Sequence, residues 1–148
     1  MKTSSKNSRE DVRVFVSRAA ADREPARKLS DAMARRHGAR VFDPAEMLMS
    51  AGGDWQARLK DELAGSDVFV ALMSPEALES SFVLREIGAA WALDKPVVLV
   101  LENVSERAGL LENWSDQFMV NLDDLDDPEV MSQLLRRHRE DAELNAKA

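Results

Sequence analysis

Residues 68–73 read VFVALM, an unbroken run of six apolar residues between Ser66-Asp67 and Ser74-Pro75. A strand with one solvent-facing side alternates apolar and polar residues, so a short run that is apolar throughout is typical of a strand covered by helices on both faces. Such strands belong to parallel sheets, whose strands are joined by helical crossovers. The run therefore predicts an α/β protein in which residues 68–73 form a buried strand.

Apolar strand candidates alternate with segments of helical spacing along the whole chain. Further strands are expected at 12–16, 40–42, 97–101 and 118–120. Helices are expected at 22–37, 55–64, 81–93 and 128–139, with a short helical turn after Ser74-Pro75, a broken helix over 108–114 and a loop over 43–53. This alternation predicts a flavodoxin-like five-stranded parallel sheet of order 2-1-3-4-5 with helices on both faces. The folded domain is expected at 11–139, between a disordered lead at 1–10 and a frayed tail at 140–148.

The composition removes several classes of protein from consideration. The net charge of −7 disfavours a nucleic-acid-binding protein, because phosphate backbones attract basic surfaces. The chain has no cysteine, and His37 and His138 lack the spacing of metal ligands, so neither disulfides nor a metal site are expected. No apolar run approaches the ~20 residues of a membrane helix, and the polar start does not look like a signal peptide. We expect a cytoplasmic protein without nucleic-acid or membrane partners.

Glu86 occupies a position where a charge is costly. In a helix, its neighbours three and four residues away are Phe82, Val83, Ala89 and Ala90, all of them apolar. A carboxylate on this face must be partly buried, and it lies near the carboxyl edge of the sheet, where open α/β folds bind ligands. The sequence leaves two interpretations open: a functional carboxylate, or a surface glutamate that pairs with a base such as Arg85.

Motifs of several common α/β functions are missing. A phospho-receiver needs acidic residues where the chain reads SRAA at 17–20 and MSP at 73–75. The GxxxxGK[ST] loop of P-loop proteins, the GxGxxG fingerprint of dinucleotide-binding folds and the GxSxG elbow of α/β-hydrolases are all absent. These absences disfavour the four classes that depend on the motifs.

Five segments of the chain occur in the order and spacing of one known family. They read DVRVFVS at 11–17, RVFD at 40–43 followed by GGDW at 52–55, SDVFVALMSP at 66–75, SSFVLREI at 80–87, and KPV at 95–97. Together they resemble the Toll/interleukin-1 receptor (TIR) domain, most closely its bacterial members, over residues 11–139. The chain departs from the family pattern at Phe82, where Trp is frequent, at Val83, where Cys is frequent, and at Arg18, where an aromatic residue is usual.

The resemblance implies a function for Glu86. Many TIR domains with the matching glutamate cleave NAD+ between ribose and nicotinamide, which gives nicotinamide and ADP-ribose or a cyclic form of ADP-ribose. By this resemblance Glu86 is the catalytic residue, NAD+ is a substrate and not a cofactor, and the setting is bacterial defence, such as antiviral defence, or signalling. The family also implies assembly into a homo-oligomer through TIR–TIR contacts.

Two other functions remain open beside this one. A non-catalytic scaffold that assembles with other TIR domains would use the loop that ends at GGDW and the neighbouring helices. An enzyme similar to the nucleoside deoxyribosyltransferases would share the fold type and would also use a carboxylate at ribose. Glu86 favours a catalytic function, because a scaffold does not need a carboxylate among apolar residues.

The substrate-binding candidates each have a structural alternative. Phe82 is expected to wall the nicotinamide riboside pocket or to pack in the core, and Trp55 to stack on adenine or to pack at a helix start. Arg18, together with Arg23, is expected to hold the pyrophosphate or to be a solvated charge. The remaining candidates, expected to donate hydrogen bonds at strand ends or to cap helices, are Ser17 and Ser74.

Overall fold

All five strands of the sheet are parallel, and their order is β2-β1-β3-β4-β5. The computed structural model describes residues 12–49, 54–105, 111 and 117–137. The strands are β1 (Arg13–Ser17), β2 (Arg40–Phe42), β3 (Val68–Met73), β4 (Val97–Leu101) and β5 (Phe118–Asn121). The predicted sheet and its order are confirmed, and every residue of β3 is buried, as its uninterrupted apolar sequence requires.

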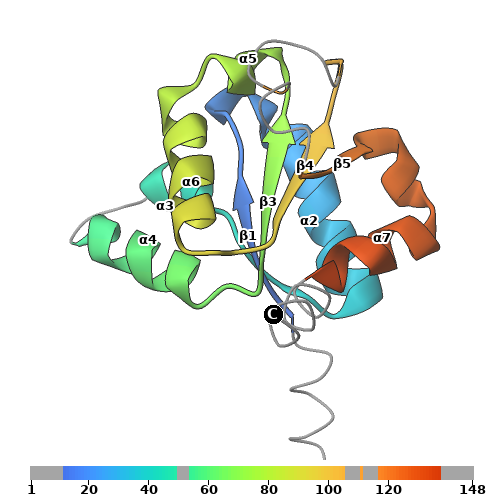
Figure 1. The fold of residues 1–148 in the computed structure, drawn as a ribbon, viewed down its shortest axis with the longest axis horizontal. Helices are drawn as coiled ribbons and strands as arrows, with labels where there is room; N and C mark the ends of the chain where they lie inside the picture. The colour runs from blue at the N-terminus through green and yellow to red at the C-terminus, as the bar shows by residue number, and fades with distance from the viewer. Residues whose placement is uncertain (1–11, 50–53, 106–110, 112–116, 138–148) are drawn as a thin grey trace, which may run out of the picture.

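Helices cover both faces of this sheet (Figure 1). The helical elements are η1 (Ala20–Asp22), α2 (Arg23–His37), α3 (Pro44–Met49), α4 (Trp55–Ala64), α5 (Pro75–Leu78), α6 (Ser81–Ala92), η3 (Leu122–Asp126) and α7 (Pro128–Leu135). Alternate residues of the strands point to opposite sides, so β1 sends Val14 and Val16 to a core with α2 and α7, and Phe15 to a second core with α4, α5 and α6. None of the described helices is long and apolar enough to cross a bilayer.

Side chains and a glycine fix the ends of these helices where the sequence indicates. The side chains of Asp54, Ser74 and Ser80 accept hydrogen bonds from backbone N–H groups in the first turns of α4, α5 and α6. Gly38 ends α2 with φ 70°, in the left-handed region. Its N–H donates to the carbonyls of Ala34 and Met33 in the last turn. These caps set the lengths of the loops and therefore where each helix starts above the sheet.

The segment expected as a loop over 43–53 contains a helix, α3, so this prediction was wrong over Pro44–Met49. Pro44 stands at the first helical position, and the Asp43 carboxylate accepts from the N–H of Ala45 at 3.1 Å. The start signal Asp43-Pro44 was therefore present in the sequence. Two 3-10 helices, η1 and η3, were also not predicted.

Other predicted boundaries shift slightly or lie outside the described residues. Helix α7 ends at Leu135, with Arg136 as its C-cap, and not at residue 139. Of the broken helix expected over 108–114, only Leu111 is described, and it is buried. The expected lead at 1–10 and tail at 140–148 lie outside the described residues.

Two glycines, Gly38 and Gly88, should respond oppositely to substitution by alanine. Gly38→Ala places a Cβ in a left-handed conformation, so we expect it to lower the free energy of unfolding by about 1–2 kcal/mol. Gly88→Ala in α6 meets no atom within 4 Å and improves helix propensity, so we expect a gain of about 0.5–1 kcal/mol. Chemical denaturation of both variants checks the pair, and a stabilising Gly38→Ala would show that α2 does not end as described.

Candidate active site

A cleft lies between α4 and α6 on one face of the sheet, with Phe15 of β1 among its walls. Its volume is about 340 Å³, within the range of ~300–1,000 Å³ that is usual for small-molecule sites. The lining residues are Phe15, Trp55, Gln56, Leu59, Lys60, Leu63, Phe82, Arg85, Glu86 and Ala89. The cleft is thus mostly apolar, with a few polar groups placed in it, which is the usual composition of a ligand site.

Glu86 brings a buried carboxylate to this cleft from the second turn of α6. The residue is only 5% exposed, and Ser17 Oγ donates a hydrogen bond of 2.5 Å to Glu86 Oε1. The other oxygen, Oε2, is buried and has no hydrogen-bond partner among the described residues. A buried acceptor without a partner is costly, and in an open cleft the group that best satisfies it is a bound ligand.

The surroundings of Glu86 favour its neutral form more than water does. Burial raises the pKa of this carboxyl from 4.5 to about 7; the Ser17 hydrogen bond lowers it, Asp43 raises it and Arg85 lowers it. The expectation of a surface glutamate paired with Arg85 is wrong, because Glu86 is buried and no ion pair joins the two described side chains. A carboxyl with a pKa near 7 in a cleft is a functional-site candidate.

Ser17 ends β1, next to β3, so its hydrogen bond places Glu86 at the point where the sheet order reverses. Open α/β folds bind ligands at this switch point. Trp55 and Phe82 lie in the same cleft lining, while Ser17 touches the cleft only through Glu86. Three of the predicted site residues therefore share one cleft, and a fourth positions the carboxylate.

Arg18 and Arg23 lie in a network of carboxylates beside this site. Arg18 is 2% exposed; its Nε donates to Asp43 at 2.9 Å and its Nη2 to Glu46 at 3.0 Å. Arg23 Nε donates to the same carboxylate of Glu46 at 2.6 Å. The network ties α3 to the end of β1. These ion pairs show that both arginines stabilise the fold here. Phosphate binding by either arginine stays a prediction.

Ser74 is a helix cap joined to a buried acid, and it is not among the residues that line the cleft. Its Oγ accepts from Ala77 N at 3.0 Å and donates a short hydrogen bond to the carboxylate of Asp22. Both side chains are buried, and the pair joins the end of β3 to the start of α2. Asp22 was not singled out from the sequence, because an aspartate at a helix start reads as an ordinary N-cap.

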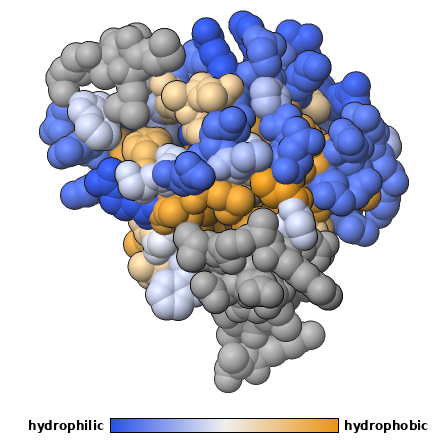
Figure 2. Space-filling view, turned by 90° about the horizontal axis from the view of Figure 1, so that it is seen from above, coloured by the Kyte–Doolittle hydropathy of each residue, from blue (hydrophilic) through white to orange (hydrophobic). Residues whose placement is uncertain are grey.

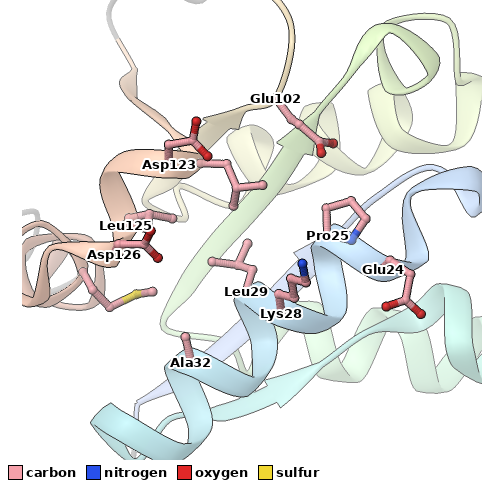
Figure 3. A pocket seen from close by; sticks show the side chains of 11 residues that line it. Glu24, Pro25, Lys28, Leu29, Ala32, Glu102, Asp123, Leu125 and Asp126 are labelled. Carbon is pink, nitrogen blue, oxygen red and sulfur yellow. The ribbon is translucent and has the colours of Figure 1, made fainter.

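A second hollow, of about 400 Å³, lies on the opposite face, between α2 and η3 (Figure 3). Its apolar floor is bordered by Lys28 and by four acids, Glu24, Glu102, Asp123 and Asp126. Burial, Asp22, Glu76 and Asp123 together raise the pKa of Glu102, as expected where negative charges gather. No cluster suited to a metal ion occurs among the described residues. This hollow repels anions, and it lacks a buried carboxylate like Glu86.

Viewed from above the orientation of Figure 1, the molecule shows hydrophobic residues across the middle of the face and hydrophilic residues to their right and left (Figure 2). The arrowheads of β3 and β4 point to this upper face in Figure 1. Ligand sites of α/β folds lie at the carboxyl edge of the sheet, and apolar surface bordered by polar residues is common at such sites.

The sheet order and the carboxylate at the switch point define a flavodoxin-like α/β protein with a candidate site between α4 and α6. The sequence profile of the TIR domain matches residues 14–135, most of the chain. The chain therefore belongs to the TIR domain family, as the motifs predicted; its bacterial origin stays a prediction.

Two solved structures share the fold. The TIR domain of the Toll-related receptor TRR-2 from Hydra magnipapillata aligns with 17% identity and a TM-score of 0.58, covering 86% of this chain and 95% of that one. The CMP N-glycosidase BcmB from Clostridium botulinum aligns with 21% identity and a TM-score of 0.51, covering 77% of this chain and 98% of that one. At these identities both likenesses show the fold alone. No curated protein matches the chain.

The burial of Glu86 predicts a pH-dependent difference in stability between the parent and Glu86→Gln. The folded state raises the pKa of Glu86 to about 7, so protonation of this carboxyl favours the folded parent. This stabilisation is complete below pH 4.5 and is lost as the pH rises through 7. Each pKa unit is worth about 1.4 kcal/mol. The free energy of unfolding of Glu86→Gln should therefore rise relative to that of the parent by roughly 3 kcal/mol between pH 4 and pH 8. Urea denaturation at several pH values measures the difference. A difference that is the same at every pH would contradict the burial.

Proposed function

We propose that this TIR domain is an NAD+ glycohydrolase that cleaves the bond between nicotinamide and ribose. The observation that carries the proposal is the oxygen Glu86 Oε2, which is buried beside an apolar cleft and has no hydrogen-bond partner within the described ranges. An acceptor in this position can meet ribose hydroxyl groups or the positive charge that develops on the ribose. The proposal agrees with the family resemblance, in which the matching glutamate is catalytic.

The reaction needs an anion more than it needs an acid. Nicotinamide leaves as a neutral molecule when the C1′–N1 bond breaks and its electron pair returns to the pyridinium ring. The positive charge then lies on the ribose as an oxocarbenium-like species, which a nearby carboxylate stabilises. Water adds at C1′ and releases a proton, so NAD+ and water give nicotinamide, ADP-ribose and H+; attack by an adenine nitrogen would give the cyclic form. One carboxylate can therefore serve without the acid–base pair of ordinary glycosidases.

Binding of the substrate should itself favour the ionised carboxylate. The pyridinium ring carries a positive charge, and an opposite charge within a few ångströms lowers the pKa of a carboxyl. A Glu86 pKa of about 7 means that the free cleft does not have to hold a permanently charged carboxylate. The cation would offset the cost of ionisation at the moment when the anion is needed.

The apolar walls fit the planar parts of the substrate. Phe82 lies one helical turn before Glu86 and lines the same cleft, where we place the nicotinamide ring. Trp55 lies at the start of α4 on the other wall, where we place the adenine. Aromatic rings provide flat apolar surface for stacking of this kind.

A scaffold function remains the second candidate, since TIR domains commonly self-associate. Trp91 is 64% exposed and Leu93 is 50% exposed at the end of α6, and such side chains often lie at contacts between proteins. A homo-oligomer formed there would be compatible with catalysis. An enzyme that acts on a different N-glycosyl bond, such as that of a nucleotide, is a weaker alternative that uses the same carboxylate.

Glu86→Gln and Glu86→Ala should reduce release of nicotinamide from NAD+ by about 100-fold or more, the usual effect of removing an acid–base or charge-stabilising group. Chromatography of the reaction products measures the rate, and circular dichroism confirms that the variants fold. The matched control is Glu79→Gln, an exposed glutamate before α6, which should keep the parent rate. A Glu86→Gln protein that cleaves NAD+ at the parent rate would disprove the assignment. A parent protein that releases no nicotinamide would favour the scaffold.

The kcat/KM for NAD+ should rise with pH and level off above an apparent pKa of about 7, because the ionised form of Glu86 is the active one. Ser17→Ala removes the hydrogen bond that lowers the pKa of Glu86, so the midpoint should move to higher pH. Initial rates from pH 5.5 to 9 measure both profiles. A flat profile, or a midpoint that Ser17→Ala moves to lower pH, would contradict the role of this pair.

A further inference from the structure

We propose that Lys60 and Arg85 form the anion site of the cleft and receive the phosphate groups of the substrate. This inference rests on the proposed function, and it assigns phosphate recognition to two residues that the sequence did not single out for it. Lys60 comes from α4 and Arg85 from α6, and both line the cleft that holds Glu86. A phosphate held between the two helices would lie in the same cleft as the carboxylate.

The two side chains are free to bind a ligand. Both are exposed, and neither forms an ion pair or a side-chain hydrogen bond with another residue of the described ranges. An exposed arginine offers a planar fork that matches two phosphate oxygens, and lysine offers a point charge beside it. The cleft is thus equipped for an anion without any rearrangement of existing pairs.

Other cations near the site are already engaged. Arg18 is buried between Asp43 and Glu46, and Arg23 shares the carboxylate of Glu46. The guanidinium of Arg58 lies 5.7 Å from the centre of the Phe42 ring. A phosphate that approached Arg18 would have to replace two carboxylates, one of them at 2.9 Å, whereas at Lys60 and Arg85 it would replace only water.

The distribution of charge over the molecule supports the same assignment. The chain carries a net charge of −7, so an anionic dinucleotide needs a local positive field to bind. The larger hollow in Figure 3 has four acids and one lysine on its border, while the cleft has two cations and Glu86. An anion is therefore directed to the cleft and away from the opposite face.

The test compares Arg85→Gln and Lys60→Gln with Lys28→Gln, which removes the same charge from the border of the acidic hollow. Loss of one charged hydrogen bond should raise the KM for NAD+ about tenfold in each cleft variant, with kcat changed by less than about threefold. Lys28→Gln should keep both constants, and Arg85→Lys should fall between the parent and Arg85→Gln. An unchanged KM in both cleft variants, or an equal rise in Lys28→Gln, would overturn the inference.

Binding of ADP-ribose separates this inference from the proposed function. If the parent releases no nicotinamide, the glycohydrolase proposal fails, and calorimetry with ADP-ribose then tests the anion site alone. The anion site predicts binding to the parent and to Lys28→Gln, and about tenfold weaker binding to Arg85→Gln and Lys60→Gln. Equal affinity for all four proteins, or no binding to the parent, would overturn the anion site.

Discussion

The hydrogen bond from Ser17 Oγ to Glu86 Oε1 is the contact on which the site depends. It joins the end of β1 to the second turn of α6, across 69 positions of sequence. It satisfies one oxygen of a carboxylate that lines the cleft, while the other oxygen is buried and has no hydrogen-bond partner in the part of the chain that the structure describes. The fold makes this possible because β1 and β3 are neighbours in the sheet and α6 follows β3 through the short helix α5. A parallel sheet with covered faces thus brings this polar pair to its switch point, beside the apolar side chains of the cleft.

Some of the charged side chains around this pair hold the fold together, and others line the cleft. Carboxylates hold Arg18 and Arg23 against α3, and Asp43, which caps that helix, also contributes to the raised pKa of Glu86. The network therefore shapes the electrostatics of the carboxylate while it anchors the segment between β2 and α4. The cations that we propose for the ligand, Lys60 and Arg85, come from the helices that wall the cleft. Loss of the network should affect the site through the position of α3 and through the field at Glu86.

Local patterns were enough to predict the sheet and the burial of Glu86. The run at 68–73 fixed the buried strand, the alternation of strands and helices fixed the sheet order, and the apolar neighbours of Glu86 on a helix revealed its burial. Contacts between distant segments were not predictable, because they depend on three-dimensional packing. Examples are the pairs Arg18–Asp43 and Ser74–Asp22, and the position of Lys60 across the cleft from α6. Helix α3 is a different case, because a local start signal, Asp43-Pro44, lies at the beginning of the segment expected as one loop up to Gly53. The predicted phosphate ligand Arg18 shows how a charged residue at a strand end can be committed to neighbours that the sequence does not identify.

In the proposed function, the buried carboxylate of Glu86 stabilises a cationic ribosyl group. The most direct test of this role is an NMR titration of the side-chain carboxyl carbon of Glu86, in the free protein and with a carbocyclic analogue of NAD+ whose bond to nicotinamide cannot be hydrolysed. We expect the pKa of Glu86 to be about 7 in the free protein and to fall when the pyridinium binds, since binding and ionisation favour each other reciprocally. A pKa that does not change on binding, or one that already lies near 4.5 in the free protein, would contradict this role.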